Sequence, residues 1–314
     1  MNPASKSVLI AAEGDDIEAV HLALTEVIPE IPVYFEDDDF DPKHIAYAAV
    51  WFPRPGLLAS LPNLEAIFSL GAGIDHILND PEVPASVPIV RMVHGKTREQ
   101  MRDYVVHAVL HYYRMMDIAA DLQARRLWQF LHLRDKSEFH VGFLGLGEMG
   151  SFAARTLVDM GFKVRGWARS KKSIPGVDCY LGEDGLSEML SLTDCLVSIL
   201  PATPQTAGCL NTRVFNTMPR GSFMINIGRG NHVAVGDLLS ALDSGHLAGA
   251  TLDVFDQEPL ALDSPLWTHS KIRVTPHIAG FGDARTVATA ISDNIRRMKL
   301  GLPPIPTGDR LRGY

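Results

Sequence analysis

The chain has 314 residues, of which 46% are hydrophobic and 21% are charged, and its formal net charge at pH 7 is −8. This length and composition are typical of a protein with about two globular domains. The negative charge argues against a general nucleic-acid or membrane-surface binder, because both need a basic face. Three cysteines without a CxxC pair, no secretory apolar segment and no apolar stretch of about 18 residues predict a cytoplasmic location.

Strand-like apolar runs alternate with segments of helical period along almost the whole chain, which predicts an α/β fold. In the first part, strands are expected near residues 7–12, 45–51, 65–69 and 88–92. A long helix is expected from Arg98 to Leu127, because apolar residues recur at helical spacing from Met101 to Met116. The later strands are expected at 139–144, 163–168, 194–200, 222–227, 248–253 and 272–275, and a last helix at 284–299.

This order of elements predicts two Rossmann-like domains, each with a doubly wound parallel sheet, and a cleft between them. The expected first domain consists of residues 1–100 together with 283–314, because the last helix crosses back to it. The expected second domain consists of residues 101–282.

The segment FLGLGEMG, residues 143–150, contains a GxGxxG pattern formed by Gly145, Gly147 and Gly150. An expected strand precedes it and an expected amphipathic helix follows it, which is the context that dinucleotide binding needs. The first glycine permits the turn, the second lets a pyrophosphate approach the backbone, and the third lets the helix pack on the strand. A glycine-rich turn without a ligand is the alternative interpretation.

The next expected strand ends at Ala168, where NAD-binding proteins usually carry an acidic residue that accepts hydrogen bonds from the ribose. Arg169, Ser170, Lys171 and Lys172 follow it. Positive charge and donors at this place suit the 2′-phosphate of NADP(H), and the missing carboxylate removes the repulsion of that phosphate. The alternative is a solvated basic turn.

Three polar residues follow later strands: Arg229, Glu258 and His277. Residues beyond the carboxyl ends of strands line the ligand crevice of a doubly wound sheet. An arginine can bind a carboxylate with two hydrogen bonds, a histidine can transfer a proton near neutral pH, and a glutamate can fix the histidine tautomer. Each residue alone has an ordinary structural explanation.

Two metal-like patterns fail on inspection. His107 and His111 have helical spacing, but Ala108 replaces the glutamate of HExxH. The acidic run at residues 37–41 resembles a calcium loop, but Pro42 replaces its glycine. No metal site is expected.

The sequence resembles the D-isomer-specific 2-hydroxyacid dehydrogenase family over nearly its whole length. The matching segments include VWFPRP, FSLGAGIDHI, FLGLGEMG, LPATPQT, NIGRG, LDVFDQEPL and TPHIAG. The resemblance implies an NADPH-dependent enzyme that reduces short 2-keto acids, such as glyoxylate to glycolate and hydroxypyruvate to D-glycerate. It also implies a homodimer through the long helix, and neither a nucleic-acid nor a membrane partner is expected.

The resemblance implies a role for each matching residue. Arg229, Glu258 and His277 form the catalytic set, with His277 as the proton donor. The backbone N–H groups of the Gly71–Ala72–Gly73 loop bind the substrate carboxylate together with Arg229, and Trp51 lines the substrate pocket. The implied cofactor contacts are Gly145, Leu146, Gly147, Glu148, Met149, Gly150, Arg169, Ser170, Lys171, Lys172, Leu200, Pro201, Thr206, Ile227 and Asp253.

Two alternatives stay open at the level of the sequence. One is another dehydrogenase of the family, of the D-lactate or D-3-phosphoglycerate type. The other is a nucleotide-sensing corepressor, since such relatives can retain the catalytic residues. The preferred 2-keto acid stays open as well, because one methylene in a pocket changes discrimination by only about 1–3 kcal/mol.

Overall fold

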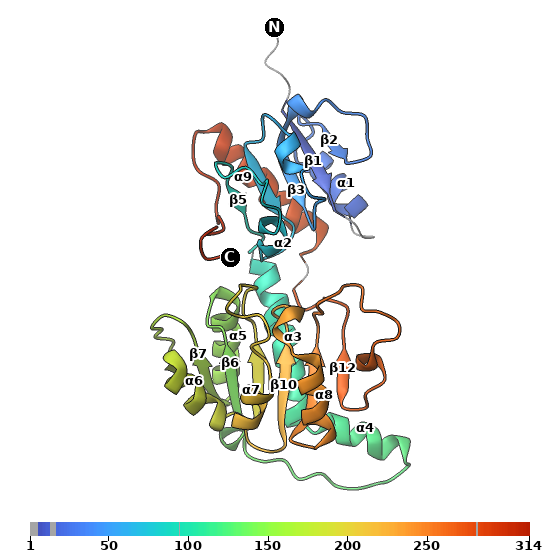
Figure 1. The fold of residues 1–314 in the computed structure, drawn as a ribbon, viewed down its shortest axis with the longest axis vertical. Coiled ribbons are helices and arrows are strands. Elements are labelled where there is room, and N and C mark those ends of the chain that lie inside the picture. The colour runs from blue at the N-terminus through green and yellow to red at the C-terminus, as the bar shows by residue number, and fades with distance from the viewer. Residues whose placement is uncertain (1–5, 13–16, 94, 281) are drawn as a thin grey trace. The chain divides into compact units, whose positions relative to one another are not determined.

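The computed structural model describes residues 6–12, 17–93, 95–280 and 282–314 (Figure 1). The chain divides into two compact units. Unit 1 consists of Met1–Thr97 and Phe281–Tyr314, and unit 2 consists of Arg98–Gly280.

Unit 1 contains a five-stranded parallel sheet with the order β2-β1-β3-β4-β5. The strands are β1 (Ser7–Ala11), β2 (Val33–Phe35), β3 (Ile45–Val50), β4 (Ala66–Ser69) and β5 (Ile89–Val90). β1, β3 and β4 are buried along their whole length, which explains why their sequences are continuous apolar runs.

Alternate residues of these strands pack on opposite sides of the sheet. Val8, Tyr47 and Phe68 pack against α1 (Ile17–Val27) and α9 (Ala284–Lys299). Leu9, Ala48 and Ile67 pack with apolar residues of the segments between the strands and with Ile77 of α2 (Asp75–Leu78). The last helix of the chain therefore completes the core of the first unit.

Unit 2 contains a seven-stranded parallel sheet with the order β12-β11-β10-β9-β6-β7-β8. The strands are β6 (His140–Leu144), β7 (Lys163–Trp167), β8 (Val177–Tyr180), β9 (Cys195–Ser198), β10 (Ser222–Asn226), β11 (Leu247–Leu252) and β12 (Ile272–Val274). The strand order reverses direction between β6 and β9, and in doubly wound sheets this switch point is where ligands bind.

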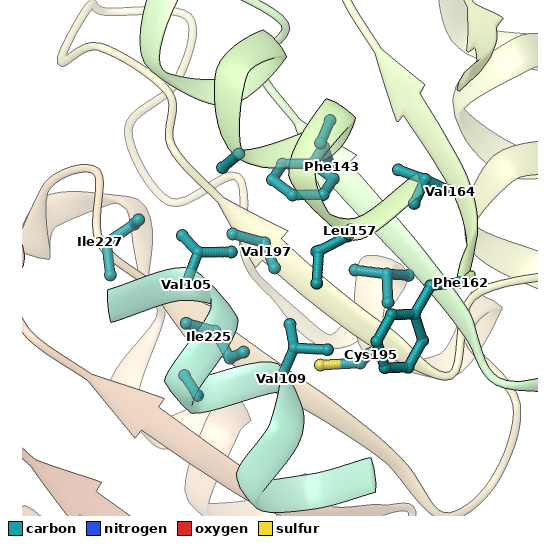
Figure 2. Packing of buried hydrophobic residues seen from close by; sticks show 14 of the residues in the cluster. Val105, Val109, Phe143, Leu157, Phe162, Val164, Cys195, Val197, Ile225 and Ile227 are labelled. Atoms are coloured by element: carbon teal, nitrogen blue, oxygen red, sulfur yellow. The ribbon is translucent and has the colours of Figure 1, made fainter. Parts of the chain in front are cut away.

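Helices cover both faces of this sheet. α3 (Gly95–Tyr113) places Val105 and Val109 against strand residues such as Val197 and Ile225, beside Leu157 of α5 (Glu148–Asp159), as Figure 2 shows. The other face packs against α6 (Gly182–Ser191), α7 (Thr212–Thr217) and α8 (Val235–Asp243). The fold class predicted from the sequence, α/β with doubly wound parallel sheets, is confirmed.

The long helix expected over residues 98–127 is in fact two helices. α3 ends at Tyr113, Met115 adopts a left-handed conformation with φ of 56°, and α4 spans Met116–Ala124. The apolar residues that recur at helical spacing from Met101 to Met116 change in burial at this break: Tyr112 before it is 3% exposed, whereas Met116 after it is 48% exposed. The sequence pattern continued across the break because the residues after it are also apolar.

Candidate active site

The glycine-rich turn joins β6 to α5 in the form that dinucleotide binding requires. Gly145 has a φ of +105°, which favours glycine. A Cβ on Gly150 would lie 2.1 Å from the carbonyl oxygen of Gly145, so this glycine permits the close approach of helix and strand. A Cβ on Gly147 would meet no atom within 4 Å, so the space beside the second glycine is open.

Gly147 is also the N-cap of α5 and has no side chain that could accept the first helical N–H groups. These N–H groups and the positive end of the helix dipole suit a phosphate. The geometry therefore fits a pyrophosphate held by the backbone of Glu148, Met149 and Gly150, with Leu146 buried beneath the turn.

The basic turn follows β7, as the sequence predicted. Ala168 is 8% exposed, and its N–H donates to the carbonyl of Tyr180 at 3.1 Å. Arg169, Ser170, Lys171 and Lys172 are all exposed beyond it. None of the described residues 168–172 at the tip of β7 is a carboxylate, and the positive charges lie at the end of the strand that neighbours β6.

The loop from Leu200 to Thr206 follows β9, on the other side of the switch point. The hydroxyl of Thr206 donates to the carbonyl of Pro201 at 2.8 Å and accepts from the N–H of Thr203 at 2.9 Å. Thr206 therefore shapes this loop from within. Ile227 is 3% exposed and belongs to the core beneath the sheet edge.

Arg229 lies beyond β10 in a loop that is fixed by two residues the sequence reasoning missed. The amide of Asn226 donates to the carbonyl of Arg229 at 2.8 Å. The N–H of Arg229 donates to Nδ1 of His232 at 3.3 Å, and Nε2 of His232 lies 3.2 Å from the carbonyl of Pro201. Since Nδ1 accepts, Nε2 carries the proton, and His232 ties the arginine loop to the loop after β9.

Glu258 and His277 form a close pair. Nδ1 of His277 lies 2.7 Å from Oε2 of Glu258, and the side chains are 30% and 28% exposed. The other carboxylate oxygen, Oε1, accepts from the N–H of Phe255 at 2.8 Å. Burial raises the pKa of Glu258, but the hydrogen bond and charge of His277, the N–H of Phe255 and the charge of Arg229 outweigh it, so the pKa lies below its ordinary value.

The pair has the arrangement of a histidine whose tautomer is fixed by a carboxylate. A carboxylate on Nδ1 directs Nε2 toward a reacting group and favours the protonated ring. Arg229, Glu258 and His277 follow the neighbouring strands β10, β11 and β12, so the sheet brings the three predicted residues to one edge.

Asp253, at the end of β11, is fully buried and its carboxylate binds the loop that carries His277. Oδ1 accepts from the hydroxyl of Thr275 at 2.6 Å and from the N–H of Ile278 at 2.9 Å, and Oδ2 accepts from the N–H of Ala279 at 2.9 Å. This support of the His277 loop was not predicted. Its sequence signal was only a polar residue at the end of a buried strand.

In unit 1, the Gly71–Ala72–Gly73 loop follows β4, and each of its carbonyl groups has its own donor. The hydroxyl of the fully buried Ser69 has one proton and lies nearest the oxygen of Gly73, at 2.7 Å, and the N–H of Met92 donates to the oxygen of Gly71 at 3.1 Å. Nε of Arg91 donates to the oxygen of Ala72 at 2.8 Å. Because the carbonyl groups are directed toward these donors, the loop backbone presents its other side, with the N–H groups of Ala72 and Gly73, to a ligand.

Trp51 follows β3 in the same unit and packs on this loop. A Cβ on Gly71 would lie 2.3 Å from Cζ3 of Trp51, so glycine is needed for this contact. The Trp51 ring also lies against His76, tilted by 52° with ring centroids 4.4 Å apart, and meets Phe52 edge-on at 5.1 Å. Trp51 therefore forms an aromatic wall beside the loop.

Within the described residues, no group of three or more His, Cys, Asp or Glu side chains could hold a metal ion. No helix in the same part of the chain combines the length and the apolar character needed to cross a membrane.

A doubly wound unit with a phosphate-binding turn, and with an arginine and a histidine–glutamate pair beyond its strands, has the framework of a nicotinamide-dependent oxidoreductase. Residues 106–279, more than half of the chain, match the family described as D-isomer specific 2-hydroxyacid dehydrogenase, NAD binding domain. The chain belongs to the D-isomer-specific 2-hydroxyacid dehydrogenase family.

Similar proteins are known over the whole length. The chain is 40% identical over 298 residues to glyoxylate/hydroxypyruvate reductase A of Escherichia fergusonii, covering 93% of this chain and 95% of that protein. It is similar to the NADPH-dependent glyoxylate/hydroxypyruvate reductase of Sinorhizobium meliloti solved with NADP and sulfate, with 37% identity, a TM-score of 0.93 and coverage of 98% and 100%. It is also similar to a family member from Xanthobacter autotrophicus solved with NADPH and MES, with 37% identity, a TM-score of 0.92 and coverage of 99% and 100%.

Proposed function

We propose that this protein uses NADPH to reduce short 2-keto acids, glyoxylate to glycolate and hydroxypyruvate to D-glycerate. The observation that carries the proposal is the 2.7 Å contact between His277 and Glu258 on the unit that has the dinucleotide-binding turn. Arg229 follows β10, the strand next to β11 in the same sheet. The similarity to reductases of the same activity, at 40% identity over 298 residues, supports the choice of substrate.

We assign the two parts of the reaction to two sets of residues. The guanidinium of Arg229 binds the substrate carboxylate and polarises the keto oxygen. In the Gly71–Ala72–Gly73 loop, the N–H groups of Ala72 and Gly73 are assigned to the same carboxylate, while the N–H of Gly71 donates to the hydroxyl of Ser69 at 3.3 Å. Unit 1 is thus the proposed substrate-binding domain, with Trp51 as part of the substrate pocket, and unit 2 is the proposed cofactor-binding domain. The boundaries expected from the sequence, 1–100 with 283–314 and 101–282, lie within three residues of those of the two units.

The reaction then needs a hydride and a proton. NADPH supplies the hydride to the carbonyl carbon. His277 gives the proton on Nε2 to the oxygen that becomes the alcohol, and Glu258 stabilises the protonated ring until this transfer. The product is a 2-hydroxy acid, and His277 regains a proton from solvent.

We propose NADPH over NADH because the tip of β7 carries the exposed basic turn and no carboxylate. A 2′-phosphate there gains charge-assisted hydrogen bonds from Arg169 and the lysines, whereas the ribose hydroxyls of NADH find no carboxylate acceptor at this tip. Leu200, Pro201 and Thr206, in the loop after β9, are the further cofactor contacts that we propose. Ile227 and Asp253 were expected as contacts as well, but they are 3% and 0% exposed, so they support the site through their strand ends and offer no open surface to the cofactor.

The direct experiment is a panel of NADPH-oxidation assays with glyoxylate, hydroxypyruvate, pyruvate and phenylpyruvate, each repeated with NADH. We expect the highest kcat/KM for glyoxylate or hydroxypyruvate with NADPH. If none of the four acids is reduced with either cofactor, the proposed function is wrong. A preference for pyruvate or phenylpyruvate would keep the reaction and correct the substrate.

We also propose that two copies associate through residues 116–133, and that the protein works in the cytoplasm. This segment carries Trp128 at 93% exposure and Phe130 at 78%, with Met116, Ile118 and Leu127 between 41% and 48%. Apolar side chains gathered to this degree are typical of a protein interface. The cysteines are free, as is usual in a reducing compartment.

A further inference from the structure

A chain of hydrogen bonds connects α3 to the loop of His277. The hydroxyl of Tyr104 lies 2.5 Å from Oγ1 of Thr275, although the two residues are 171 positions apart. Oγ1 of Thr275 in turn lies 2.6 Å from Oδ1 of Asp253. All three residues belong to unit 2.

The direction of these hydrogen bonds follows from the number of protons. A carboxylate only accepts, so the single hydroxyl proton of Thr275 points to Asp253. Tyr104 must then donate to Thr275. Burial, the largest cause, and the charge of Asp253 raise the pKa of Tyr104 to about 12, so the phenol keeps its proton through the whole physiological range.

These hydrogen bonds end at a backbone conformation that is uncommon outside glycine. His277 has a φ of 54°, in the left-handed region, where Asn, Asp and His are the most frequent residues apart from glycine. Its N–H donates to the carbonyl of Asp253 at 2.8 Å, and the next two N–H groups, of Ile278 and Ala279, donate to the Asp253 carboxylate at 2.9 Å. Asp253 thus holds three successive N–H groups on and after the histidine.

We infer that Tyr104, Thr275 and Asp253 are positioning residues that hold His277 in the left-handed conformation from which its ring meets Glu258. The catalytic role of His277 itself belongs to the proposed function, on which this inference rests. We call the hydrogen bonds from Tyr104 to Thr275 and from Thr275 to Asp253 the relay. The relay orients the Asp253 carboxylate, the carboxylate orients the loop by its hydrogen bonds, and the loop sets the direction of the His277 imidazole.

The chain contains a matched control for this relay. Tyr112 lies two turns further along α3, and its hydroxyl is 2.7 Å from Oγ1 of Thr251 in β11. Tyr112 and Thr251 are 3% and 4% exposed. Removing this hydroxyl also deletes a buried Tyr–Thr hydrogen bond between α3 and the sheet, but none of the bonds that connect Asp253 to the His277 loop.

The experiment compares Tyr104→Phe with Tyr112→Phe in the full-length protein. We measure kcat and KM for glyoxylate, the Kd of NADPH, and the hydrogen exchange of the Ile278 and Ala279 amides. Tyr104→Phe is expected to lower kcat roughly fivefold, as for one lost hydrogen bond to a positioned group, with little change in KM or in the Kd of NADPH. Faster exchange of the two amides should accompany it, while Tyr112→Phe leaves both kcat and this exchange unchanged.

Thr275 provides the second test. Thr275→Val should lower kcat about tenfold or more and expose the same amides, and Thr275→Ser, which restores the hydroxyl, should recover most of both losses. Equal kcat in Tyr104→Phe and Tyr112→Phe, or unchanged amide exchange in Thr275→Val, would overturn the inference. If the unmodified protein reduces no 2-keto acid, the proposed function fails, but the amide exchange still decides whether the relay holds the loop.

Discussion

At the scale of single residues, both carboxylate oxygens of Glu258 have defined partners, His277 on one side and the N–H of Phe255 on the other. The pKa of this carboxyl is lowered, so it is ionised at neutral pH when the histidine needs a counter-charge.

We therefore predict that Glu258→Gln shifts the pH dependence of glyoxylate reduction. In the unmodified protein the pKa of Glu258 is lowered, so its carboxylate persists as the pH falls, and its support of His277 is lost only in acid solution below the ordinary range of a glutamic acid. The amide of the variant has no proton to gain there, so this acid-side loss of kcat should be absent from its pH profile. The measurement is kcat at saturating NADPH and glyoxylate as a function of pH, and an acid-side loss that is the same in both proteins would argue against the pairing.

Some residues around the candidate site were predictable from the sequence and others were not. Arg229, Glu258 and His277 were predicted because each is a polar residue just beyond an apolar strand. Asn226, His232 and Thr275 were missed, although they hold the loops of those residues, because nothing in their local sequence distinguishes them from ordinary strand-end residues. The partner of Tyr104 lies 171 positions away, and no local pattern indicates such a contact.

At the scale of elements, the three glycines of the β6–α5 turn serve separable purposes. Gly150 is needed for the fold, because its Cβ would collide with the Gly145 carbonyl, whereas the space beside Gly147 is open. A methyl group on Gly147 would occupy the place assigned to the pyrophosphate.

Gly147→Ala should therefore weaken NADPH binding far more than it weakens the fold. We expect the Kd of NADPH to rise roughly a hundredfold or more, since a steric block removes the phosphate contacts, while stability falls by only about 1 kcal/mol for a poorer N-cap. Fluorescence titration and thermal unfolding measure the two effects. Gly236→Ala, at another glycine with open space, is the control and should change neither much.

The basic turn after β7 allows a test of cofactor choice. Replacing Arg169 and Lys172 together by serine should lower kcat/KM with NADPH roughly thirtyfold, more at low salt, and leave the value with NADH about the same. Arg155→Ser with Lys163→Ser removes two exposed charges from α5 and from the other end of β7, and should not change the ratio. If replacing Arg169 and Lys172 does not change the ratio of kcat/KM with NADPH to kcat/KM with NADH, the turn does not bind the 2′-phosphate.

The elements themselves were largely predictable. Buried parallel strands give continuous apolar runs, so most of the long strands were expected within one or two residues of their ends. β2 and β8 were missed, because they are short edge strands with half-buried or exposed positions. The break at Met115 was missed because a left-handed residue without glycine leaves no sequence signal.

At the scale of the whole molecule, the exposed apolar segment 116–133 predicts a dimer. Trp128→Ser with Phe130→Ser should convert the protein to a monomer at micromolar concentration, because aromatic side chains dominate such interfaces. Light scattering after gel filtration measures the molar mass. The control is Leu262→Ser with Leu311→Ser, which removes side chains that are 96% and 100% exposed elsewhere. A dimer that survives the aromatic replacements, or a monomeric unmodified protein, would contradict this assignment.

In the proposed mechanism, His277 protonates the substrate on a unit that binds NADPH independently of that proton. The measurement is kcat for NADPH oxidation at saturating glyoxylate in His277→Gln, together with the Kd of NADPH for the same protein. We predict that kcat falls roughly a hundredfold or more, the usual contribution of a general acid, while the Kd stays within about twofold of the unmodified protein. Near-normal turnover with intact NADPH binding would remove His277 from the mechanism and contradict the account.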